Sequence, residues 1–569
     1  MKIRALSFFA LLPLFAQVNV LTQRNDNQRS GLNLQETALN PVSVKTKFHK
    51  LWALYSDAKI MAQPLYVSNL KSAKCPGGCN TVIFCSMKGT VYAYMADQQP
   101  TNVNDTLVWA RYLGDPRPGD KDIDMWSTDD PWWGILGTPV IDLQKGLIYL
   151  VAWNPDQNYR LYGLDLASGN VTKGAVVIQG SVGGLNFTGT GNWVQHRKQR
   201  AGLLLVNGTL YVCFGGDNPN ALAGWMFAYD ANTLALQTIW SPTPGGRNGG
   251  IWQSGQGPAA DQQGLIYLQT GDGDVNIPAA RYGDSLVKLK MEHSGGNSTL
   301  TVADHFTPCD QMFLARCDLD MGSAGPLLFG GNFILGGGKR GMLYLMDRTK
   351  LGGYTPGPFP PNNVNCGFIP DCTDSPSVLQ KVNSGHGHVH GTPVFWSGPG
   401  GKAWIYAMPE GFPLQAIPFE NNRLSDAKRL RGGWSPANPT GVECWAPVEH
   451  WMPGGILTVS SDGATPNTGI VWAVVPANGD ANSYRGVKGM LVAVSAEDVR
   501  KELWRSQAAN GADTADSFGL LSRFVPPTVA NGKVFIATAG DREPLHRYCP
   551  PQAPTQFPAN YSLAVYGLR

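Results

Sequence analysis

Three histidines alternate along one short stretch of the sequence, at His386, His388 and His390. In an extended chain, residues two apart point to the same side, so the three imidazoles would lie on one side of the chain. Imidazole is a preferred ligand of zinc and copper, and the pattern predicts a transition-metal site that His450 or Glu410 would complete. Without a metal, His388, His390 or Glu410 would suit a catalytic general base near neutral pH. The plainer alternative is a polar loop, because glycines interrupt the stretch.

A second alternating set consists of carboxylates, at Asp120, Asp122 and Asp124. Hard oxygen ligands at this spacing favour Ca²⁺, but the spacing is not that of an EF-hand, and an acidic surface loop would have the same pattern. The run Gly271–Asp274 also carries two carboxylates. Its glycines favour a turn over a cation-binding loop.

These groups belong to a chain of 569 residues, of which 15% are charged and 10% are aromatic. The low charge and the high apolar content exclude a disordered chain. The 68 glycines and 41 prolines would interrupt long helices, so a coiled coil or a helical repeat is excluded as well. The composition predicts a β-rich protein with a large core and many turns.

The first residues have the pattern of a secretory signal peptide. Lys2 and Arg4 precede the apolar run Ala5–Ala16, which is too short to span a bilayer. We expect residues 1–16 to be removed and the mature protein, residues 17–569, to be secreted or periplasmic. Removal of the two cations takes the net charge from +3 to about +1, so neither nucleic-acid binding nor electrostatic attachment to a membrane is expected. We also expect no membrane span.

The ten cysteines agree with export to an oxidising compartment. Three pairs lie close in sequence and are predicted to form local disulfides: Cys75 with Cys79, Cys309 with Cys317, and Cys366 with Cys372. A zinc knuckle is the alternative for the first pair, but no second pair completes four ligands.

The other cysteines and the sequons give smaller expectations. Cys85 and Cys213 lie in apolar strand patterns and are predicted to be buried thiols, while Cys444 and Cys549 are candidates for a bridge across the fold. Sequons for N-glycosylation begin at Asn104, Asn170, Asn186, Asn207, Asn297 and Asn560.

Internal repetition predicts the fold. A short apolar strand introduced by proline or glycine recurs eight times, beginning at Gln63–Leu65, Thr138–Val140, Ala201–Leu203, Gly257–Ala259, Gly325–Leu327, Thr392–Val394, Met452–Gly454 and Pro526–Thr528. Further short β-branched or aromatic runs follow each start, as antiparallel strands require. Four strands repeated eight times predict an all-β, eight-bladed antiparallel β-propeller. Seven blades is the alternative, because the fourth strands of blades five and six are weak.

The ends of the chain predict how the ring closes. The last repeat ends with its third strand, Leu563–Tyr566, and the pair Leu51–Trp52 matches the fourth strands. We therefore expect residues 47–56 to complete the last blade, and the ring to be a single domain. Trp109, Trp240 and Trp504 of the fourth strands are predicted to be wedges between blades. A short helix is predicted at Ala496–Leu503.

Five phrases of the sequence resemble a known group of secreted propellers: Gly249–Gly255, His388–Pro393, Met452–Gly455, Thr468–Ala473 and Phe524–Val529. They resemble pyrroloquinoline-quinone-like propellers of the quinoprotein alcohol dehydrogenase-like superfamily, and the resemblance covers nearly all of the mature chain. It implies a propeller with a quinone in the central cavity, a Ca²⁺ ion and an acidic base. The sequence has no adjacent cysteine pair, which such dehydrogenases often carry, and no Cys-x-x-Cys-His motif, so no c-type haem is expected.

In a propeller, residues just before each innermost strand gather around one mouth of the central channel. The residues at these positions are Gln63, Trp132, Trp133, Arg197, Arg200, Trp252, Gln253, His386, His388, His390, Glu449, His450 and Arg523. Such side chains suit a planar ligand with acidic groups, and the predicted cofactor-binding residues are Arg200, Trp252, Gln253, Trp133 and Arg523. The alternative is structural, with Arg and His hydrogen-bonding carbonyl groups between blades.

Two functional hypotheses follow from the sequence. The first is a monomeric, quinone-dependent oxidoreductase that acts on an alcohol or a related small molecule at the channel mouth, with His388, His390 or Glu410 as the base. The second is a propeller without enzymatic activity that binds a ligand or a protein at the same mouth and has lost, or never had, the quinone.

Overall fold

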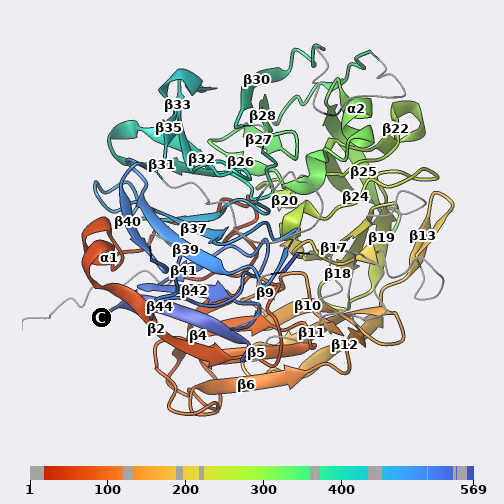
Figure 1. The fold of residues 1–569 in the computed structure, drawn as a ribbon. Helices are drawn as coiled ribbons and strands as arrows, with labels where there is room; N and C mark the ends of the chain where they lie inside the picture. The colour runs from red at the N-terminus through yellow and green to blue at the C-terminus, as the bar shows by residue number, and fades with distance from the viewer. Residues whose placement is uncertain are drawn as a thin grey trace, which may run out of the picture.

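The computed structural model describes residues 18–118, 132–187, 197–216, 223–358, 366, 372–385, 387–433, 451–482, 484–508, 511–541, 546–547 and 560–569. Within these residues, eight sheets of four or five strands follow one another around a ring (Figure 1). The all-β, eight-bladed propeller is therefore confirmed, and the seven-bladed alternative is wrong.

The first four blades are built in chain order, each from its innermost strand outward. Blade 1 contains β3 (Leu65–Leu70), β4 (Cys79–Cys85), β5 (Thr90–Met95) and β6 (Leu107–Tyr112). Blade 2 contains β9 (Val140–Asp142), β10 (Leu147–Trp153), β11 (Tyr159–Asp165) and β12 (Val171–Val177). Blade 3 contains β16 (Leu204–Val206), β17 (Thr209–Gly216), β18 (Trp225–Asp230) and β19 (Leu236–Trp240), with β15 (Arg197–Lys198) beside β17. Blade 4 contains β20 (Ala259–Ala260), β21 (Ile266–Gln269), β24 (Leu286–Ser294) and β25 (Asn297–Thr307), with β29 (Gly353–Tyr354) parallel to β25.

The other four blades follow the same plan. Blade 5 contains β26 (Leu327–Phe329), β27 (Phe333–Gly337), β28 (Met342–Asp347) and β30 (Val378–Asn383). Blade 6 contains β31 (Val394–Ser397), β32 (Ala403–Ala407) and β33 (Gln415–Glu420), with the short β34 (Arg423–Leu424) and β35 (Leu430–Arg431) outside. Blade 7 contains β36 (Ile456–Ser460), β37 (Ile470–Pro476), β39 (Gly489–Ser495) and β40 (Glu502–Arg505). Blade 8 contains β41 (Thr528–Ala530), β42 (Lys533–Ala537), β44 (Ser562–Leu568) and β2 (Phe48–Tyr55).

Short sheets and helices lie in the segments that connect the blade strands. Four two-stranded sheets pair β7 (Arg117–Pro118) with β8 (Trp132–Trp133), β13 (Gly180–Val182) with β14 (Leu185–Phe187), β22 (Val275–Asn276) with β23 (Arg281–Tyr282), and β38 (Tyr484–Arg485) with β43 (His546–Arg547). In the described residues, the α-helices are α1 (Pro41–Lys47) and α2 (Gln311–Arg316), and the 3-10 turns are η3 (Gln253–Gly255), η4 (Ile277–Ala279), η5 (Met321–Ser323), η6 (Pro399–Gly401) and η7 (Asp426–Lys428).

An N-terminal strand closes the ring, as the sequence predicts. β2 pairs antiparallel with the last strand, β44, with Trp52 opposite Val565 and Leu54 opposite Leu563. Helix α1 leads into β2 and has a capping box, in which the side chains of Asn40 and Ser43 accept each other's backbone N–H groups. The two ends of the chain thus share one sheet, and opening the ring would break the β2–β44 hydrogen bonds.

The segment before this strand makes a second closure, which the sequence did not predict. Residues 20–33 hydrogen-bond to the innermost strand, or the residue just before it, in every blade. The partners in blades 1 to 8 are Tyr66, Ile141, Leu205, Ala260, Leu328, Pro393, Val459 and Val529. Within the segment, β1 (Leu32–Asn33) runs parallel to β36. The segment therefore bridges the inner rim of the ring, and we call residues 20–33 the inner bridge.

Two arginines anchor the inner bridge. Arg29 is fully buried and donates to the carbonyl oxygens of Pro258, Gln23 and Leu203. Arg24, also buried, donates to the carbonyl oxygens of Arg29, Pro393 and Leu457. Burial lowers the pKa of Arg24 to about 9 and that of Arg29 to about 10. The cost of desolvating these cations is offset by hydrogen bonds to carbonyl groups that would otherwise be buried without donors.

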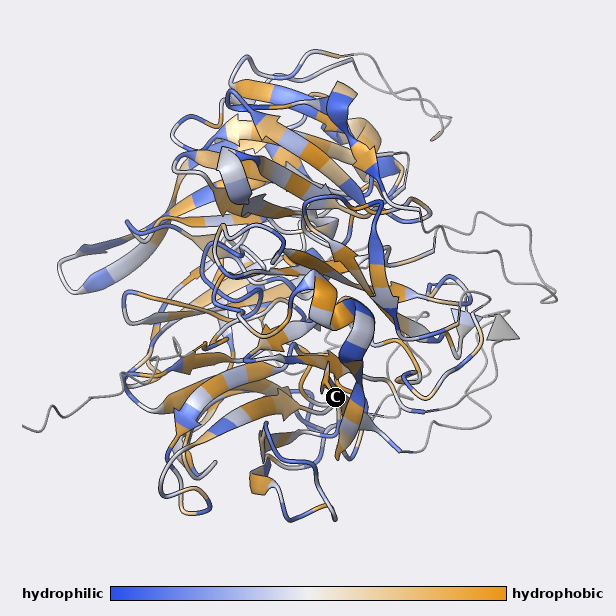
Figure 2. Ribbon diagram, turned by 90° about the vertical axis from the view of Figure 1, so that its left-hand side faces the viewer, coloured by the Kyte–Doolittle hydropathy of each residue, from blue (hydrophilic) through white to orange (hydrophobic). Residues whose placement is uncertain are grey.

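Apolar side chains fill the spaces between blades. Hydrophobic residues, orange in Figure 2, recur along the strands. The predicted tryptophan wedges are confirmed. Trp109 of blade 1 is buried and its Nε1 donates to the carbonyl oxygen of Leu166 in blade 2. Trp504 of blade 7 packs edge-on against Phe48 of blade 8, at 4.9 Å between ring centroids, and Trp240 is buried in the cluster that joins blades 3 and 4.

The prediction of a helix at Ala496–Leu503 is wrong. The chain there forms bends and a turn, and Glu502 already begins β40. β40 pairs with β39, with Ala493 opposite Trp504. An isolated helix of this length is marginal in water, so pairing with an existing sheet prevails.

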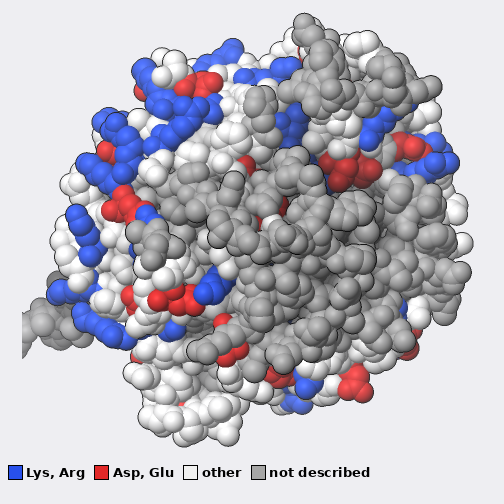
Figure 3. Space-filling view, viewed as in Figure 1, with Lys and Arg blue, Asp and Glu red and all other residues white. Residues whose placement is uncertain are grey.

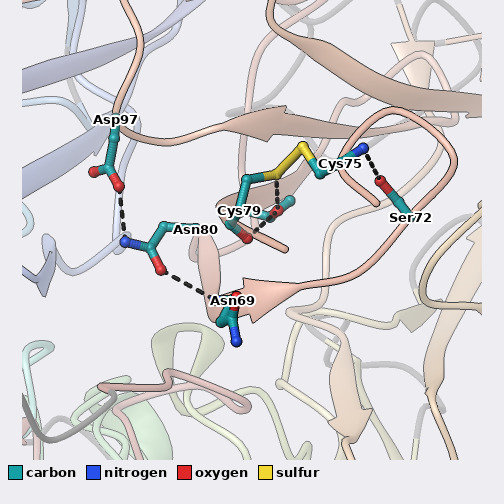
Figure 4. Close-up of a disulfide and its surroundings, with 7 residues drawn as sticks. Asn69, Ser72, Cys75, Cys79, Asn80 and Asp97 are labelled. Atoms are coloured by element: carbon teal, nitrogen blue, oxygen red, sulfur yellow. Dashed lines mark hydrogen bonds between the residues drawn. A yellow bond between two sulfur atoms is a disulfide. The ribbon is translucent and has the colours of Figure 1, made fainter. Parts of the chain in front are cut away.

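The disulfides confirm one predicted pairing and correct two. Cys75 and Cys79 form a local bridge in the β3–β4 turn, where Ser72 and Asn80 support it through hydrogen bonds (Figure 4). The other bridges are Cys309–Cys372 and Cys317–Cys366, instead of Cys309–Cys317 and Cys366–Cys372. Helix α2 lies between Cys309 and Cys317 and keeps them apart along its axis, so each reaches the segment beside it instead.

The remaining expectations concern the other four cysteines, the surface charge and the membrane span. Cys85 and Cys213 are buried free thiols, as predicted. Cys444 and Cys549 lie outside the described residues. Positive and negative side chains are interspersed over the described part of the surface in Figure 3. None of the described helices is long and apolar enough to cross a membrane.

Replacement of Arg29 by Met should destabilise the protein by about 3 kcal/mol, because buried carbonyl groups of three chain segments lose their donor. The midpoint of urea unfolding followed by tryptophan fluorescence measures this change. Arg423→Met removes an exposed guanidinium and should leave the midpoint unchanged. Equal midpoints for Arg29→Met and the wild type would contradict an anchoring role for the inner bridge.

Digestion without reduction should release the peptides of Cys309 and Cys372 as one linked species, and those of Cys317 and Cys366 as another. Mass spectrometry before and after reduction identifies them. Linked peptides containing Cys366 and Cys372 as partners would instead support the local pairing.

Candidate functional site

Trp252 lies where connecting loops from several blades meet. It follows blade 3 and precedes the innermost strand of blade 4, in the turn that ends with η3. Its ring centroid lies 5.9 Å from that of His390 before blade 6 and 6.4 Å from that of Phe524 before blade 8. The Nζ atom of Lys339, in the β27–β28 turn of blade 5, lies 5.9 Å from the Trp252 ring. The structure therefore brings together aromatic and cationic groups from four blades.

The backbone at this meeting point is strained. Gln253 and Ser254 directly follow Trp252 and have φ angles of 44° and 48°, and Phe524 has φ of 66°. Non-glycine residues rarely adopt this left-handed conformation, and it costs about 1–3 kcal/mol at each residue. A close approach adds to the constraint, because a Cβ atom on Gly215 would lie 2.7 Å from the Cβ of Trp252. Such strain is typical of sites where side-chain placement matters more than stability.

Arg200 reaches the same region but is engaged with the backbone. Its guanidinium donates to the carbonyl oxygens of Met61, Leu136 and Arg523, and lies 5.7 Å from the centroid of Phe524. Burial, and then the charge of Arg523, lower the pKa of Arg200 to about 10. Arg523 itself donates to the carbonyl oxygen of Ala481. These contacts match the structural alternative for arginines at the mouth, while the positive charge of Arg200 remains beside the aromatic cluster.

Two other predicted cofactor-binding residues, Gln253 and Trp133, make contacts within the fold. The Gln253 amide donates to the carbonyl oxygen of Gln256 and accepts from the backbone N–H of Gln269, so it holds the turn. Trp133 packs in the cluster between blades 2 and 3, with Lys198 Nζ 4.6 Å from its ring. The cofactor-binding roles of Gln253 and Trp133 stay predictions.

A group of carboxylates beside Trp252 was missed by the sequence analysis. The Nζ atom of Lys339 lies 2.6 Å from Asp320 Oδ2 and 2.6 Å from Asp318 Oδ1. Asp320 Oδ1 accepts the backbone N–H of Asp272, and Asp284 Oδ1 accepts the backbone N–H of Met321. We call Asp272, Asp284, Asp318 and Asp320 the carboxylate group. The turn predicted at Gly271–Asp274 therefore brings Asp272 beside Asp320, one of the two carboxylates that pair with Lys339.

Crowding of negative charge changes the protonation of the carboxylate group. Burial, and then the charge of Asp320, raise the pKa of Asp272 from its ordinary value of 3.8 to about 8. Burial, and then the charges of Asp320 and Asp272, raise the pKa of Asp284 well above its ordinary range. Burial opposes ionisation of Asp320, but the Lys339 ammonium outweighs it and lowers the pKa of Asp320 to about 2. Lys339 alone therefore does not offset four ionised carboxylates, and Asp272 and Asp284 keep their protons to a higher pH than ordinary carboxyl groups do.

The predicted histidine cluster is brought together at the inner end of blade 6. His390 Nε2 lies 3.0 Å from Glu410 Oε1, and His388 Nδ1 lies 3.3 Å from Glu410 Oε2. The side chains of His390 and Glu410 are fully buried, while His388 is partly exposed. The ligating atoms of the three residues all lie within 4.8 Å of one another, so the set can hold a metal ion.

Several predicted site residues lie outside the described residues. These are the metal candidates His386, Asp120, Asp122 and Asp124, and the mouth residues Glu449 and His450. A surface depression of about 430 Å³ lies beside the Cys75–Cys79 bridge, and it shares no lining residue with the region around Trp252.

Comparisons with known proteins agree with the fold. No family model and no curated protein sequence matches the chain. Among solved structures, the chain is similar to a europium-containing methanol dehydrogenase, with 14% identity, a TM-score of 0.58, and 97% of this chain and 98% of that chain covered. It is also similar to the quinohaemoprotein alcohol dehydrogenase from Comamonas testosteroni, with 15% identity, a TM-score of 0.55 and coverage of 98% and 81%.

A third similar structure is a quinohaemoprotein alcohol dehydrogenase from Pseudomonas putida HK5, with 12% identity, a TM-score of 0.51 and coverage of 97% and 80%. The protein has the quinoprotein alcohol dehydrogenase-like propeller fold. The fold implied by the sequence resemblance is thereby confirmed, and at these identities the likeness concerns the fold alone.

In the absence of added cations, Asp272 should make the protein less stable as the pH rises from about 4 to about 8. Its folded-state pKa lies above its unfolded value, so the folded protein holds a proton that the unfolded chain has released over this range. Asp272→Asn removes this titration, and the stability of the variant relative to the wild type should therefore increase between pH 5 and pH 9. Urea unfolding at both pH values measures the difference, with Asp274→Asn as the control for the loss of a nearby carboxylate. If the free energies of unfolding of Asp272→Asn and the wild type differ by the same amount at pH 5 and at pH 9, the raised pKa of Asp272 is contradicted.

Proposed function

We propose that the protein is an exported, monomeric quinoprotein-type oxidoreductase that acts on an alcohol or a related small molecule. The observation that carries the proposal is the position of Trp252, whose indole ring lies beside the Lys339 ammonium and the carboxylate group. The shared fold, the three disulfides and the resemblance of the N-terminal residues to a signal peptide support it.

The residues around Trp252 fit a planar, acidic cofactor. Trp252 is only partly buried, so its ring is available for stacking, and Lys339 and Arg200 place positive charge beside the aromatic cluster. The structure also offers hard oxygen donors to a cation. The raised pKa of Asp272 indicates that this carboxyl group loses its proton readily only when more positive charge is nearby, as a bound cation would supply. Carboxylate oxygens are among the ligands that Ca²⁺ prefers.

The roles of the chain's own side chains follow from these contacts. Trp252, Lys339 and Arg200 would hold pyrroloquinoline quinone, which when bound supplies a two-electron acceptor. Asp272 and Asp318 would hold the cation. Asp320, kept ionised by Lys339, would accept the hydroxyl proton of the substrate. Because one of the similar structures is a europium-containing methanol dehydrogenase, a lanthanide is a second cation to test. The absence of a c-type haem remains a prediction from the missing Cys-x-x-Cys-His motif.

The alternative function is a propeller that binds a ligand or a protein without turnover. A specific observation favours it, because Arg200 and Gln253 use their hydrogen bonds within the fold. The two functions differ in whether the protein takes up quinone, so an experiment that measures quinone uptake distinguishes them.

Purified protein should take up pyrroloquinoline quinone with Ca²⁺ or La³⁺ and then reduce an artificial dye in the presence of a primary alcohol. Trp252→Ala should weaken quinone binding about tenfold or more, as measured by fluorescence titration, because the aromatic platform is lost. Asp320→Asn should lower kcat at least 100-fold, as expected for loss of a general base. Asp347→Asn, at a partly exposed carboxylate in blade 5, is the matched control and should retain both properties. A protein that takes up no quinone and reduces no dye would leave only the binding function.

A further inference from the structure

The hydrogen bonds of His390 determine which of its ring nitrogens carries a proton. Ser254 Oγ donates its only hydrogen to the carbonyl oxygen of Ser323, at 2.5 Å. The same Oγ lies 3.2 Å from His390 Nδ1, and with its hydrogen already used it can only accept there. His390 Nδ1 must therefore carry a hydrogen. In the neutral ring, this leaves the lone pair on Nε2.

The Nε2 atom faces a carboxylate. Glu410 Oε1 lies 3.0 Å from it, and both side chains are fully buried. A lone pair and a carboxylate oxygen repel each other at this distance, and the repulsion is strong where water is excluded. A cation between them removes the repulsion, and this cation is either a proton or a metal ion. His388 Nδ1 adds a third donor, 3.3 Å from Glu410 Oε2.

The spacing of these donors suits a small metal ion. Zinc binds imidazole nitrogen and carboxylate oxygen at about 2.0–2.2 Å, so ligand atoms around a tetrahedral zinc lie about 3.4 Å apart. The two measured separations, 3.0 and 3.3 Å, are close to that value. Among the described residues, two histidines and one glutamate supply three ligands, which leaves a fourth position open, as in catalytic zinc sites.

The backbone holds the three donors in place before any ion arrives. The backbone N–H of Glu410 donates to the carbonyl oxygen of His388 at 3.0 Å, which joins the two loops of blade 6. Gly387 permits this approach, because a Cβ atom there would lie 1.9 Å from the Glu410 carbonyl oxygen. Ser254, from the turn after Trp252, orients His390 through its second nitrogen, as outer partners of metal-bound histidines do.

We propose that His388, His390 and Glu410 form a site for a divalent transition metal, Zn²⁺ or Cu²⁺, at the inner end of blade 6. The proposal is independent of the quinone and of the carboxylate group, because nitrogen ligands select transition metals whereas an all-oxygen set selects Ca²⁺. It assigns these three residues to metal binding instead of the general-base role. The open position would take water or an oxygen or nitrogen atom of a small ligand.

Isothermal titration of chelator-treated protein with Zn²⁺ at pH 7.5, without quinone, tests the site. We expect one equivalent to bind with Kd of about 1 μM or below, in the presence of excess Ca²⁺. Affinity should fall steeply below about pH 6, because protons compete for the imidazoles. Co²⁺ should give the visible absorption of a four-coordinate site, and Cu²⁺ should displace it. Absence of Zn²⁺ binding in the wild type, or complete displacement by Ca²⁺, would overturn the proposal.

Variants separate this site from other zinc-binding groups. His388→Ala, at the partly exposed ligand, should weaken Zn²⁺ binding at least tenfold while the protein stays folded, and Glu410→Gln should weaken it further. Ser254→Ala tests the outer partner and should weaken binding about tenfold. The exposed His293→Ala is the matched control and should bind as the wild type does. Unchanged affinity in both His388→Ala and Glu410→Gln would show that zinc binds elsewhere and would overturn the assignment.

Failure of this proposal is distinguishable from failure of the proposed function. The zinc experiments use the metal alone and need no turnover. The quinone and dye experiments probe Trp252 and Asp320, and neither residue is among the three proposed ligands.

Discussion

The closed ring is the constraint on which the other features depend. The segments before the innermost strands of blades 4, 6 and 8 meet around Trp252, and they meet because the eighth blade is completed by a strand from the other end of the chain. The inner bridge adds hydrogen bonds to every blade, with Arg29 and Arg24 donating to carbonyl groups near the axis. Radial repetition packs the sheet of each blade against those of its two neighbours. The inner bridge adds contacts that couple blades across the ring.

This coupling explains how strained loops persist around Trp252. Left-handed conformations at Gln253, Ser254 and Phe524 cost free energy that local contacts do not recover. Packing between blades and the inner bridge supply the compensating stability. The result is a set of side chains from blades 4, 5, 6 and 8 that meet with little freedom, and such rigidity suits binding and catalysis.

The groups that meet there differ in their chemistry. The carboxylate group offers hard oxygen donors, two of them paired with Lys339, whereas His388, His390 and Glu410 form a mixed nitrogen and oxygen set. Arg200 brings a cation that is held by carbonyl groups. Trp252 and Phe524 lie among these groups and give the region its apolar surface. Different donor types favour different cations, so the two sets need not compete.

The sequence by itself determined the architecture, because the periodic strand starts, the short apolar runs and the Leu51–Trp52 pair are local patterns that a propeller repeats. It also offered Glu410, with His450 as the alternative, as a partner of His388 and His390, and Glu410 lies in the β32–β33 loop of the same blade. Tertiary structure alone decided three other features. Asp272, Asp318 and Asp320 lie in turns whose sequences also suit ordinary surface loops, and only their convergence on Lys339 distinguishes them. The disulfide partners of Cys309 and Cys317 depend on helix α2 between them. The inner bridge binds through carbonyl groups, which every residue carries, so no pattern of side chains could reveal its partners.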